Sequence, residues 1–204
     1  MLNNCQYSSR KLTGRCRARR VISLACLLVS VIAFSWPPTI AAAIAQPVTL
    51  DYQVKAAMLY KFLSYTDWPE ARFPTPQSPY RLWVLGTDNL LEELRGIVAG
   101  RIVNGHPIEV FAATTPDDIV DAHLVFVGRG FEKSLPNLSL LAEKQSYLIV
   151  TENEQGLKPG SIINLRLVDG RVGFDVSLKN AQSCNLKLSA RLLSVASSVE
   201  EGSR

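Results

Sequence analysis

Hydrophobic and polar residues alternate most regularly near the C-terminal end of the chain. Apolar residues take every second position from 163 to 167 and again from 172 to 176, and Asp169 and Gly170 separate the two runs. A two-residue turn of this type places both central residues at positive φ, which glycine adopts most easily. The pattern predicts an antiparallel hairpin, then a short polar helix over 177–183, a short strand over 186–188 and a final helix that Ser189 opens.

A second periodicity runs from position 54 to position 65. Val54, Ala57, Met58, Phe62 and Tyr65 recur at intervals of three and four residues, which is the spacing of one helix face. We expect this helix to end before position 68, because that residue precedes a proline and therefore avoids helical backbone. The aspartate at position 51 is expected in the first turn, near the positive end of the helix.

Apolar runs alternate with helix signals between these two segments. Strands are predicted over 80–85, after an Asn104-Gly105 turn, over 123–127 and over 147–150. Helices are predicted from Asn89, which is placed to cap, from Thr115, and from Ser134 to about position 144. Such alternation is typical of a parallel sheet covered on both faces. The predicted fold class is α/β, a three-layer α/β/α domain with a mixed, mostly parallel sheet and a C-terminal antiparallel hairpin.

The first 45 residues have a different character. Six basic residues and no acid occupy positions 1–20, an uncharged apolar run follows from Val21 to Trp36, and Ala43-Ile44-Ala45 precedes Gln46. These features are typical of a secretory signal peptide. The alternative is an uncleaved anchor, but the run is shorter than the roughly 20 residues that span a bilayer. The sequence predicts a cleaved signal peptide over 1–45, a single domain over 46–204 and export to the periplasm.

Removal of that segment changes the charge. The whole chain has a formal net charge of +4, whereas positions 46–204 hold 16 basic and 18 acidic residues, a net charge near −2. The basic character therefore belongs to the signal segment, and the remaining domain lacks the clustered lysine and arginine of a nucleic-acid-binding protein. Cys184 is the one cysteine after position 45, and we interpret it as a buried small hydrophobic residue.

The sequence contains few groups that could carry chemistry. The loops after strands 80–85, 123–127 and 147–150 are the places where an open α/β sheet binds ligands. After the second of these strands, Gly128 and Gly130 lack the third glycine of a dinucleotide fingerprint, although Arg129 leaves open a small anionic ligand. The acidic stretch 151–156 is interpreted as a solvated turn. His106 is expected to face solvent and His123 to begin a buried strand, and neither has metal-ligand neighbours in sequence. We expect no catalytic residue, cofactor or metal.

Two segments resemble one known family. The segment VKAAMLYKFLSYTDWP at 54–69 and the segment INLRLVDGRVGFDVSLKNAQSCNLKLSARLLSVA at 163–196 are similar to the two ends of the YfiR family, also called DUF4154. The family often has glycine where Asn185 stands, a residue that also adopts left-handed backbone. Members often carry disulfides, so the single Cys184 is a departure, and any redox switch is in doubt here.

The resemblance implies a regulatory function. Members of the family are periplasmic proteins that bind the periplasmic sensor region of an inner-membrane diguanylate cyclase and hold the enzyme inactive, which lowers cyclic-di-GMP and biofilm formation. An OmpA-like outer-membrane lipoprotein can sequester them. The resemblance therefore implies a non-enzymatic repressor, and it leaves homodimerisation open. A periplasmic small-molecule sensor is the alternative function, and an envelope enzyme is the third class.

Four residues are candidates for contact with a partner: Trp68, Arg129, Asn164 and Arg171. Trp68 stands beside a proline-rich loop, where a tryptophan is often half exposed, although a role in sealing the helix onto the sheet is the alternative. Arg171 follows the hairpin turn, a position that favours a solvated strand residue slightly over a partner contact. Trp68, Asn164 and Arg171 match the family pattern, and that match supports the fold more strongly than it supports a particular partner.

Overall fold

A mixed sheet of eight strands forms the centre of the part of the chain that the computed structural model describes, residues 47–202. Its strand order is β10-β8-β7-β6-β5-β2-β4-β3, and β1 and β9 form a separate antiparallel pair. These residues fall within one compact unit. The predicted signal peptide and its cleavage site near Ala45 lie outside the described residues.

The elements follow the predicted alternation closely. Their bounds in chain order are α2 (Pro47–Ser64), β1 (Thr66–Asp67), η1 (Glu70–Arg72), β2 (Tyr80–Leu85), α3 (Asp88–Val98), β3 (Ile102–Val103), β4 (His106–Ala113), η2 (Pro116–Asp118), β5 (Leu124–Val127), η3 (Glu132–Ser134), α4 (Leu135–Gln145), β6 (Leu148–Glu152), β7 (Ile163–Val168), β8 (Arg171–Ser177), α5 (Leu178–Ser183), β9 (Lys187–Leu188), α6 (Ala190–Leu193) and β10 (Ser198–Glu200).

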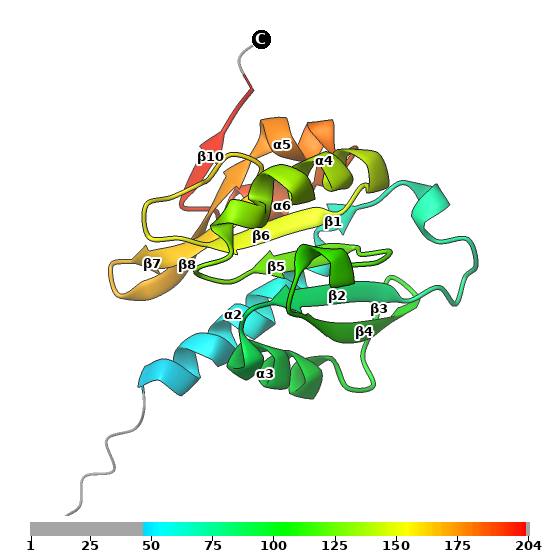
Figure 1. Ribbon diagram of the computed structural model, residues 1–204, viewed down its shortest axis with the longest axis horizontal. Coiled ribbons are helices and arrows are strands. Elements are labelled where there is room, and N and C mark those ends of the chain that lie inside the picture. Colours follow the sequence, from blue (N-terminus) through cyan, green and yellow to red (C-terminus); the bar gives the residue numbers. More distant parts are fainter. Residues whose placement is uncertain (1–46, 203–204) are drawn as a thin grey trace, which may run out of the picture. The chain divides into compact units, whose positions relative to one another are not determined.

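Helices cover both faces of the sheet. Figure 1 shows α2 and α3 on one side of the strands and α4 and α5 on the other. The strands β4, β2, β5, β6 and β7 run parallel to one another, β3 pairs with β4 in the antiparallel direction, and β7 and β8 form the antiparallel hairpin. All four residues of β5 are buried, as a strand covered on both faces requires. The predicted three-layer α/β fold class is confirmed.

Two tight turns have the geometry that their sequences predict. Asp169 and Gly170 adopt φ values of 50° and 74°, and Asn104 and Gly105 adopt 49° and 88°. Positive φ at both central residues matches the twist of the flanking strands, which explains why Asp-Gly and Asn-Gly stand there. Asn185 also adopts left-handed backbone, with φ of 56°.

The first helix departs from its prediction in start and orientation. It begins at Pro47, so Asp51 lies beyond the first turn and does not complement the helix end. Ala57 is exposed, although the periodicity placed it on the apolar face. The buried face is rotated relative to the prediction, and it includes a lysine that the apolar pattern had left out. Its members are Lys55, Ala56, Leu59, Phe62 and Leu63.

Other boundaries also differ from the sequence interpretation. Asn89 does not cap α3, because the helix starts one residue earlier, at Asp88, and Thr87 takes the N-cap position. Ser134 precedes α4 as its N-cap but makes no side-chain capping hydrogen bond. Strand β10 was not predicted. It is a short exposed strand that runs parallel to β8, with Ser198 opposite Asp175.

Cys184 lies in the core, as the sequence predicted. Its exposed fraction is 4%, and burial raises the pKa of its thiol to about 11. A thiol with this pKa is almost entirely protonated at neutral pH and is therefore a poor nucleophile.

Candidate functional site

The candidate site lies where the order of the parallel strands reverses. From β2 the chain continues through α3 to β4 on one side, whereas from β5 it continues through α4 to β6 on the other. The gap between β2 and β5 is therefore a topological switch point, and open α/β sheets bind ligands outside the carboxyl ends of the strands at this place. The loops after β2, β5 and β6 meet here, as the sequence analysis anticipated.

A polar pocket of about 270 Å³ opens at this point. Two glycines allow the loops to approach each other. A Cβ on Gly128 would lie 2.4 Å from Thr87 Oγ1, and a Cβ on Gly86 would lie 2.1 Å from the ring of Phe131. Side chains in either position would therefore force the β2 and β5 loops apart. The pocket is lined by Asp51, Tyr52, Lys55, Gly86, Thr87, Arg129 and Glu152.

Lys55 brings a buried positive charge to the pocket. Helix α2 places it one turn after Asp51, with which it forms an ion pair, and its Nζ lies 3.0 Å from Glu152 Oε1. The exposed fraction of the Lys55 residue is 4%. A buried ammonium loses most of its hydration and is tolerated only beside compensating charges. The two carboxylates therefore allow the lysine to occupy the buried face of α2.

Arg129 extends this set of charges toward solvent. Its Nη2 lies 2.7 Å from Glu152 Oε1 and 2.8 Å from Glu154 Oε1. Glu152 therefore receives one cation from the helix side and one from the loop after β5. We call Asp51, Lys55, Arg129, Glu152 and Glu154 the ionic cluster. The charges of its three carboxylates and two cations largely cancel. Such a cluster can hold the surrounding loops in place, or a small charged ligand can replace one of its ion pairs.

The sequence analysis did not predict that Glu152 links the sheet to α2 through an ion pair. The sequence analysis assigned 151–156 to a solvated turn, which is wrong for this residue, because β6 extends to Glu152 and its exposed fraction is 8%. The partner that explains the burial, Lys55, lies 97 positions earlier in the chain. The available signal was Lys55 itself, which stands four residues before Leu59 on an apolar helix face.

Trp68 lies at the opposite end of β5 from Arg129. Its indole Nε1 donates a hydrogen bond of 3.2 Å to the carbonyl of His123, the residue before β5. Its ring packs edge-on against Tyr80, with 5.3 Å between the centroids. The prediction that Trp68 is half exposed is wrong, since its exposed fraction is 9%. Its edge borders a separate pocket of about 570 Å³, beside Leu186 and Lys187.

The same end of the sheet holds a stack of aromatic and imidazole rings. The Phe73 ring lies between His106 and His123, at centroid distances of 4.2 Å and 4.7 Å. We call Trp68, Phe73, Tyr80, His106 and His123 the ring cluster. His106 is half-buried, with Nδ1 2.8 Å from the carbonyl of Ser78, and so does not face solvent as predicted.

His123 is buried, as its position at the start of a strand predicts. Its Nδ1 accepts a hydrogen bond of 3.2 Å from the Arg81 amide, and Nε2 lies 3.3 Å from the Arg72 carbonyl. These contacts fit a neutral ring with its proton on Nε2. Burial, and after it the positive charge of Arg72, lowers the pKa of His123 to about 4. The ring is therefore neutral at physiological pH.

The other two predicted contact residues differ in accessibility. Asn164 is fully buried, where its Nδ2 donates to the Asn153 carbonyl at 2.8 Å and its Oδ1 accepts from Thr151 at 2.9 Å. Arg171 is exposed at the start of β8. The structure therefore does not bring Trp68, Arg129, Asn164 and Arg171 into one site. Only Arg129 lies in the ionic cluster.

Across residues 47–202, no three His, Cys, Asp or Glu side chains gather in a way that could hold a metal ion. In the same range, none of the helices combines the length and hydrophobicity needed to cross a bilayer.

The fold and the site together define a class of protein. It is an α/β domain with a cluster of mutually paired charges at the topological switch point of its sheet. The model of the family DUF4154, described as YfiR/HmsC-like, matches residues 52–197, which is more than half of the chain. The chain belongs to this family, whose members are periplasmic regulators of diguanylate cyclases and form a regulatory rather than a catalytic family. No curated protein shows a significant match to the chain.

Proposed function

We propose that this protein binds the periplasmic sensor region of an inner-membrane diguanylate cyclase and holds that enzyme inactive. The observation that carries the proposal is the match to the YfiR/HmsC-like family over residues 52–197, which includes the hairpin and every member of the ionic cluster except Asp51. Repression follows if the protein binds the inactive conformation of the receptor more tightly than the active one, because a ligand shifts an equilibrium only by its differential affinity. Cyclic-di-GMP output and biofilm formation then fall without any catalytic step.

The proposal includes the organisation of the chain. Residues 1–45 act as a signal peptide that is removed near Ala45, and residues 46–204 form the single working domain in the periplasm. The family match begins at Tyr52, after the proposed cleavage point. Sequestration by an OmpA-like outer-membrane lipoprotein and formation of a homodimer belong to the proposal through the family resemblance alone.

The test is binding between two purified proteins. The full chain is expressed with its signal segment, and the processed protein is purified from the periplasm. Its binding to the purified periplasmic regions of the inner-membrane diguanylate cyclases of the source organism is measured by titration calorimetry. We expect a saturable complex, and deletion of the gene should raise cellular cyclic-di-GMP. A cyclase region that does not bind, together with unchanged cyclic-di-GMP in the deletion strain, would refute the proposal.

Charge-reversal variants then locate the contact. Arg129 and Arg171 are the two exposed members of the predicted contact set, whereas Asn164 and Trp68 are buried and act by holding their surroundings in place. Arg171→Glu is expected to weaken the complex, and Arg95→Glu, on the exposed side of α3, is the matched control. Equal affinity for the two variants would remove Arg171 from the interface.

A second function, ligand sensing, has one observation in its favour. The pocket at the switch point is lined by Lys55, Arg129 and Glu152, and Asp51 Oδ1 is buried there without a hydrogen-bond partner within residues 47–202. Groups of both signs around a small pocket suit a zwitterionic metabolite. A screen of free amino acids by thermal unfolding would give a concentration-dependent rise in melting temperature if one of them binds. The Arg129→Ala variant should lose that rise.

A further inference from the structure

The outer edge of β4 is open over most of its length. Strand β3 pairs only with His106 and Pro107, whereas β2 pairs with the other side of β4 from Ile108 to Ala113. Within the described part of the chain, six residues of β4 therefore have no strand on their outer side. An edge strand presents unpaired amide and carbonyl groups that can pair with an added strand. The opposite edge of the sheet ends in β10, which is only three residues long.

An aromatic platform lies on the sheet beside this edge. Trp83 of β2 and Phe111 of β4 are opposite each other in register, and their rings stack with 4.8 Å between centroids and 22° between planes. Both side chains are half-buried. Trp83 Nε1 donates a hydrogen bond of 3.1 Å to the Val120 carbonyl, so the platform is ordered on one side by the segment that connects β4 to β5.

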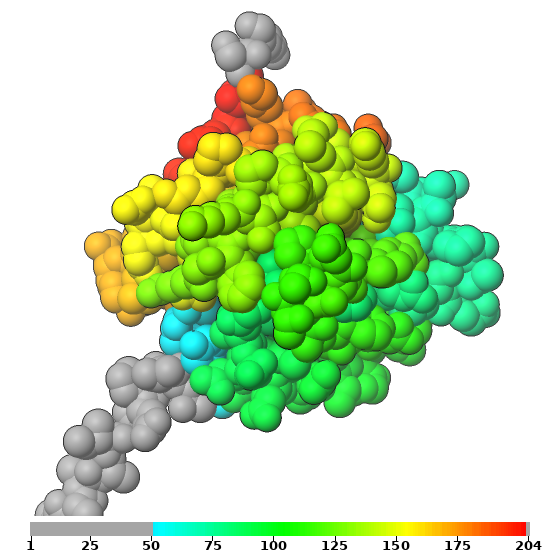
Figure 2. All heavy atoms as spheres, in the orientation of Figure 1, coloured from blue at the N-terminus to red at the C-terminus, as the bar shows by residue number. Residues whose placement is uncertain are grey.

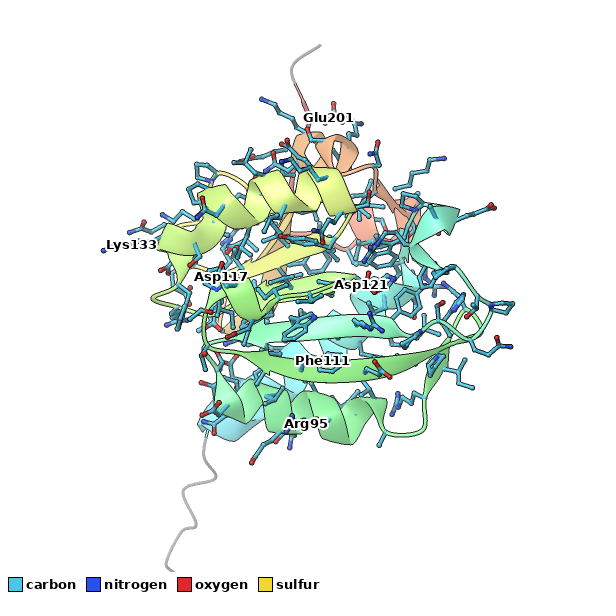
Figure 3. The ribbon with its side chains drawn as sticks, turned by 45° about the vertical axis from the view of Figure 1, so that its right-hand side comes forward. Arg95, Phe111, Asp117, Asp121, Lys133 and Glu201 are labelled. Carbon is cyan, nitrogen blue, oxygen red and sulfur yellow. The ribbon has the colours of Figure 1, made fainter. Side chains whose placement is uncertain are left out.

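No α-helix covers this platform within the described residues. The connection from β4 to β5 crosses β2, because β2 lies between those strands, and it contains only the 3-10 turn η2. Figure 3 shows Asp117 and Asp121 of this connection on the side of the sheet away from Arg95 and α3. Figure 2 shows the same segment, in green, at the surface of the molecule. Val120 is 65% exposed within it.

The rim of the platform is acidic. Glu109, Asp117, Asp118 and Asp121 are all exposed. Two arginines offset part of this charge, because Arg72 and Arg81 both pair with Asp121, and Arg81 Nε also lies 3.7 Å from Glu109. Four carboxylates against two guanidinium groups leave an excess of negative charge beside two stacked rings. A lysine or arginine side chain is attracted both by the face of an aromatic ring and by such carboxylates.

We propose that the open edge of β4 from Ile108 to Ala113 binds an extended segment of the cyclase's periplasmic region, which adds to the sheet as a further strand. The segment carries a basic side chain that lies on the Trp83–Phe111 platform. Backbone hydrogen bonds supply the register, as in other complexes formed by strand addition, and the platform supplies the preference for a basic residue. This inference rests on the proposed function, because it names the surface that the same partner uses.

The primary test is amide hydrogen exchange of the processed wild-type protein, alone and with the purified periplasmic region of the cyclase. Formation of the added strand should slow exchange within 108–113, since outward-facing amides become hydrogen-bonded, while α3 should be unaffected. A complex that forms with unchanged exchange over 108–113 would overturn the inference and leave the proposed function standing. Absence of any complex would overturn both.

Variants test the platform separately. Phe111→Lys removes one ring and adds a positive charge that repels the partner's basic side chain, so we expect the dissociation constant of the complex to rise by about tenfold or more. Phe111→Tyr keeps the ring and should bind as wild type does, and Glu92→Lys, on the exposed side of α3, controls for an added lysine elsewhere. If Phe111→Lys loses its fold, the wild-type exchange result still decides the question.

Self-association is the competing occupant of the same edge. Hydrogen exchange of the protein alone at two concentrations distinguishes it. Protection of 108–113 that increases with protein concentration in the absence of the cyclase would show that a second copy of the chain occupies the edge, and the inference would then be wrong. Exchange that is independent of concentration, with protection appearing only when the cyclase region is added, supports it.

Discussion

The two ends of β5 hold opposite kinds of chemistry. At its amino end, the ring cluster surrounds His123, a ring kept neutral by burial. At its carboxyl end, Arg129 belongs to the ionic cluster, in which the buried side chains of Glu152 and Lys55 form an ion pair. Hydrophobic burial and ring packing stabilise the first end directly. The second end gives little net stability, because desolvation offsets most of the attraction between buried charges.

This difference indicates which end is free to serve function. We therefore expect the ring cluster to contribute more to the stability of the domain than the ionic cluster does. The charged residues also stand at the switch point, where α/β sheets place their ligands. The comparison leads to an ordered set of expectations for variants at the two ends.

The largest effect is expected for Trp68→Ala. Removal of a buried indole leaves a cavity beside Tyr80 and takes away one of the two hydrogen bonds that the His123 carbonyl accepts, so the free energy of unfolding should fall by about 3–5 kcal/mol. Denaturant unfolding of the processed protein measures it. Trp83→Ala, at a half-buried tryptophan, is the matched control and should cost less. Equal losses would remove the ring cluster's special role in stability.

Acid should lower the free energy of unfolding through His123, which belongs to the ring cluster. Its pKa is about 4 in the folded protein and about 6.5 in the unfolded chain, so the unfolded chain binds more protons as the pH falls through this window. Stability is therefore fully present above pH 6.5 and declines toward pH 4, by about 2 kcal/mol between pH 7 and pH 5. His123→Asn keeps an acceptor for the Arg81 amide without a titrating ring.

Unfolding of the wild type and of His123→Asn at several pH values isolates this contribution. The difference in their free energies of unfolding should change with pH between 7 and 4.5. Parallel pH profiles for the wild type and His123→Asn would mean that the imidazole is not the group that titrates.

A smaller loss is expected for Lys55→Met at the ionic cluster. Glu152 then loses its buried cation but keeps Arg129 at 2.7 Å, so the cost should be about 2 kcal/mol, below the about 3–5 kcal/mol for a charge left without compensation. Lys61→Met, at an exposed position of the same helix, is the control. A double-mutant cycle with Glu152→Gln measures the coupling of the pair. Zero coupling would contradict the assigned ion pair.

The smallest effect on stability is expected for Arg129→Ala. The arginine side chain is 58% exposed, and ion pairs of exposed groups typically contribute less than about 1 kcal/mol. Binding of the cyclase region should change more than the melting temperature does. A melting temperature that falls as far as that of Trp68→Ala would show that the ionic cluster, too, belongs to the framework.

Most of the fold could be predicted from local patterns. Strands such as β5 and β6 are short apolar runs, and the turns at Asp169-Gly170 and Asn104-Gly105 depend on the backbone preferences of the residues within them. These signals need no knowledge of the rest of the chain. Strand β10 was missed because its three exposed residues carry no periodicity, and only the pairing with distant β8 makes them a strand.

The candidate site was predictable only in part. Arg129 was identified because it follows an apolar strand at the edge where ligands bind. The burial of Glu152 was missed, because its surroundings in sequence are polar and its partner Lys55 comes from the first helix. The burial of Trp68 was missed for a similar reason, since its contacts are with Tyr80 in β2 and with His123, which precedes β5. The position of Arg129 could be predicted from its own segment, whereas the burial of Glu152 and Trp68 depends on contacts with residues far away in the sequence.

The position of Cys184 provides a built-in reporter for the dynamics of this domain. Folding of positions 46–204 requires no oxidation step, because they contain a single cysteine. A maleimide or disulfide reagent reaches that thiol only in molecules that have opened, since the side chain is enclosed and protonated in the native state. Pulsed labelling followed by mass spectrometry would therefore count opening events in unmodified protein, with and without the receptor, and no engineered probe would be needed.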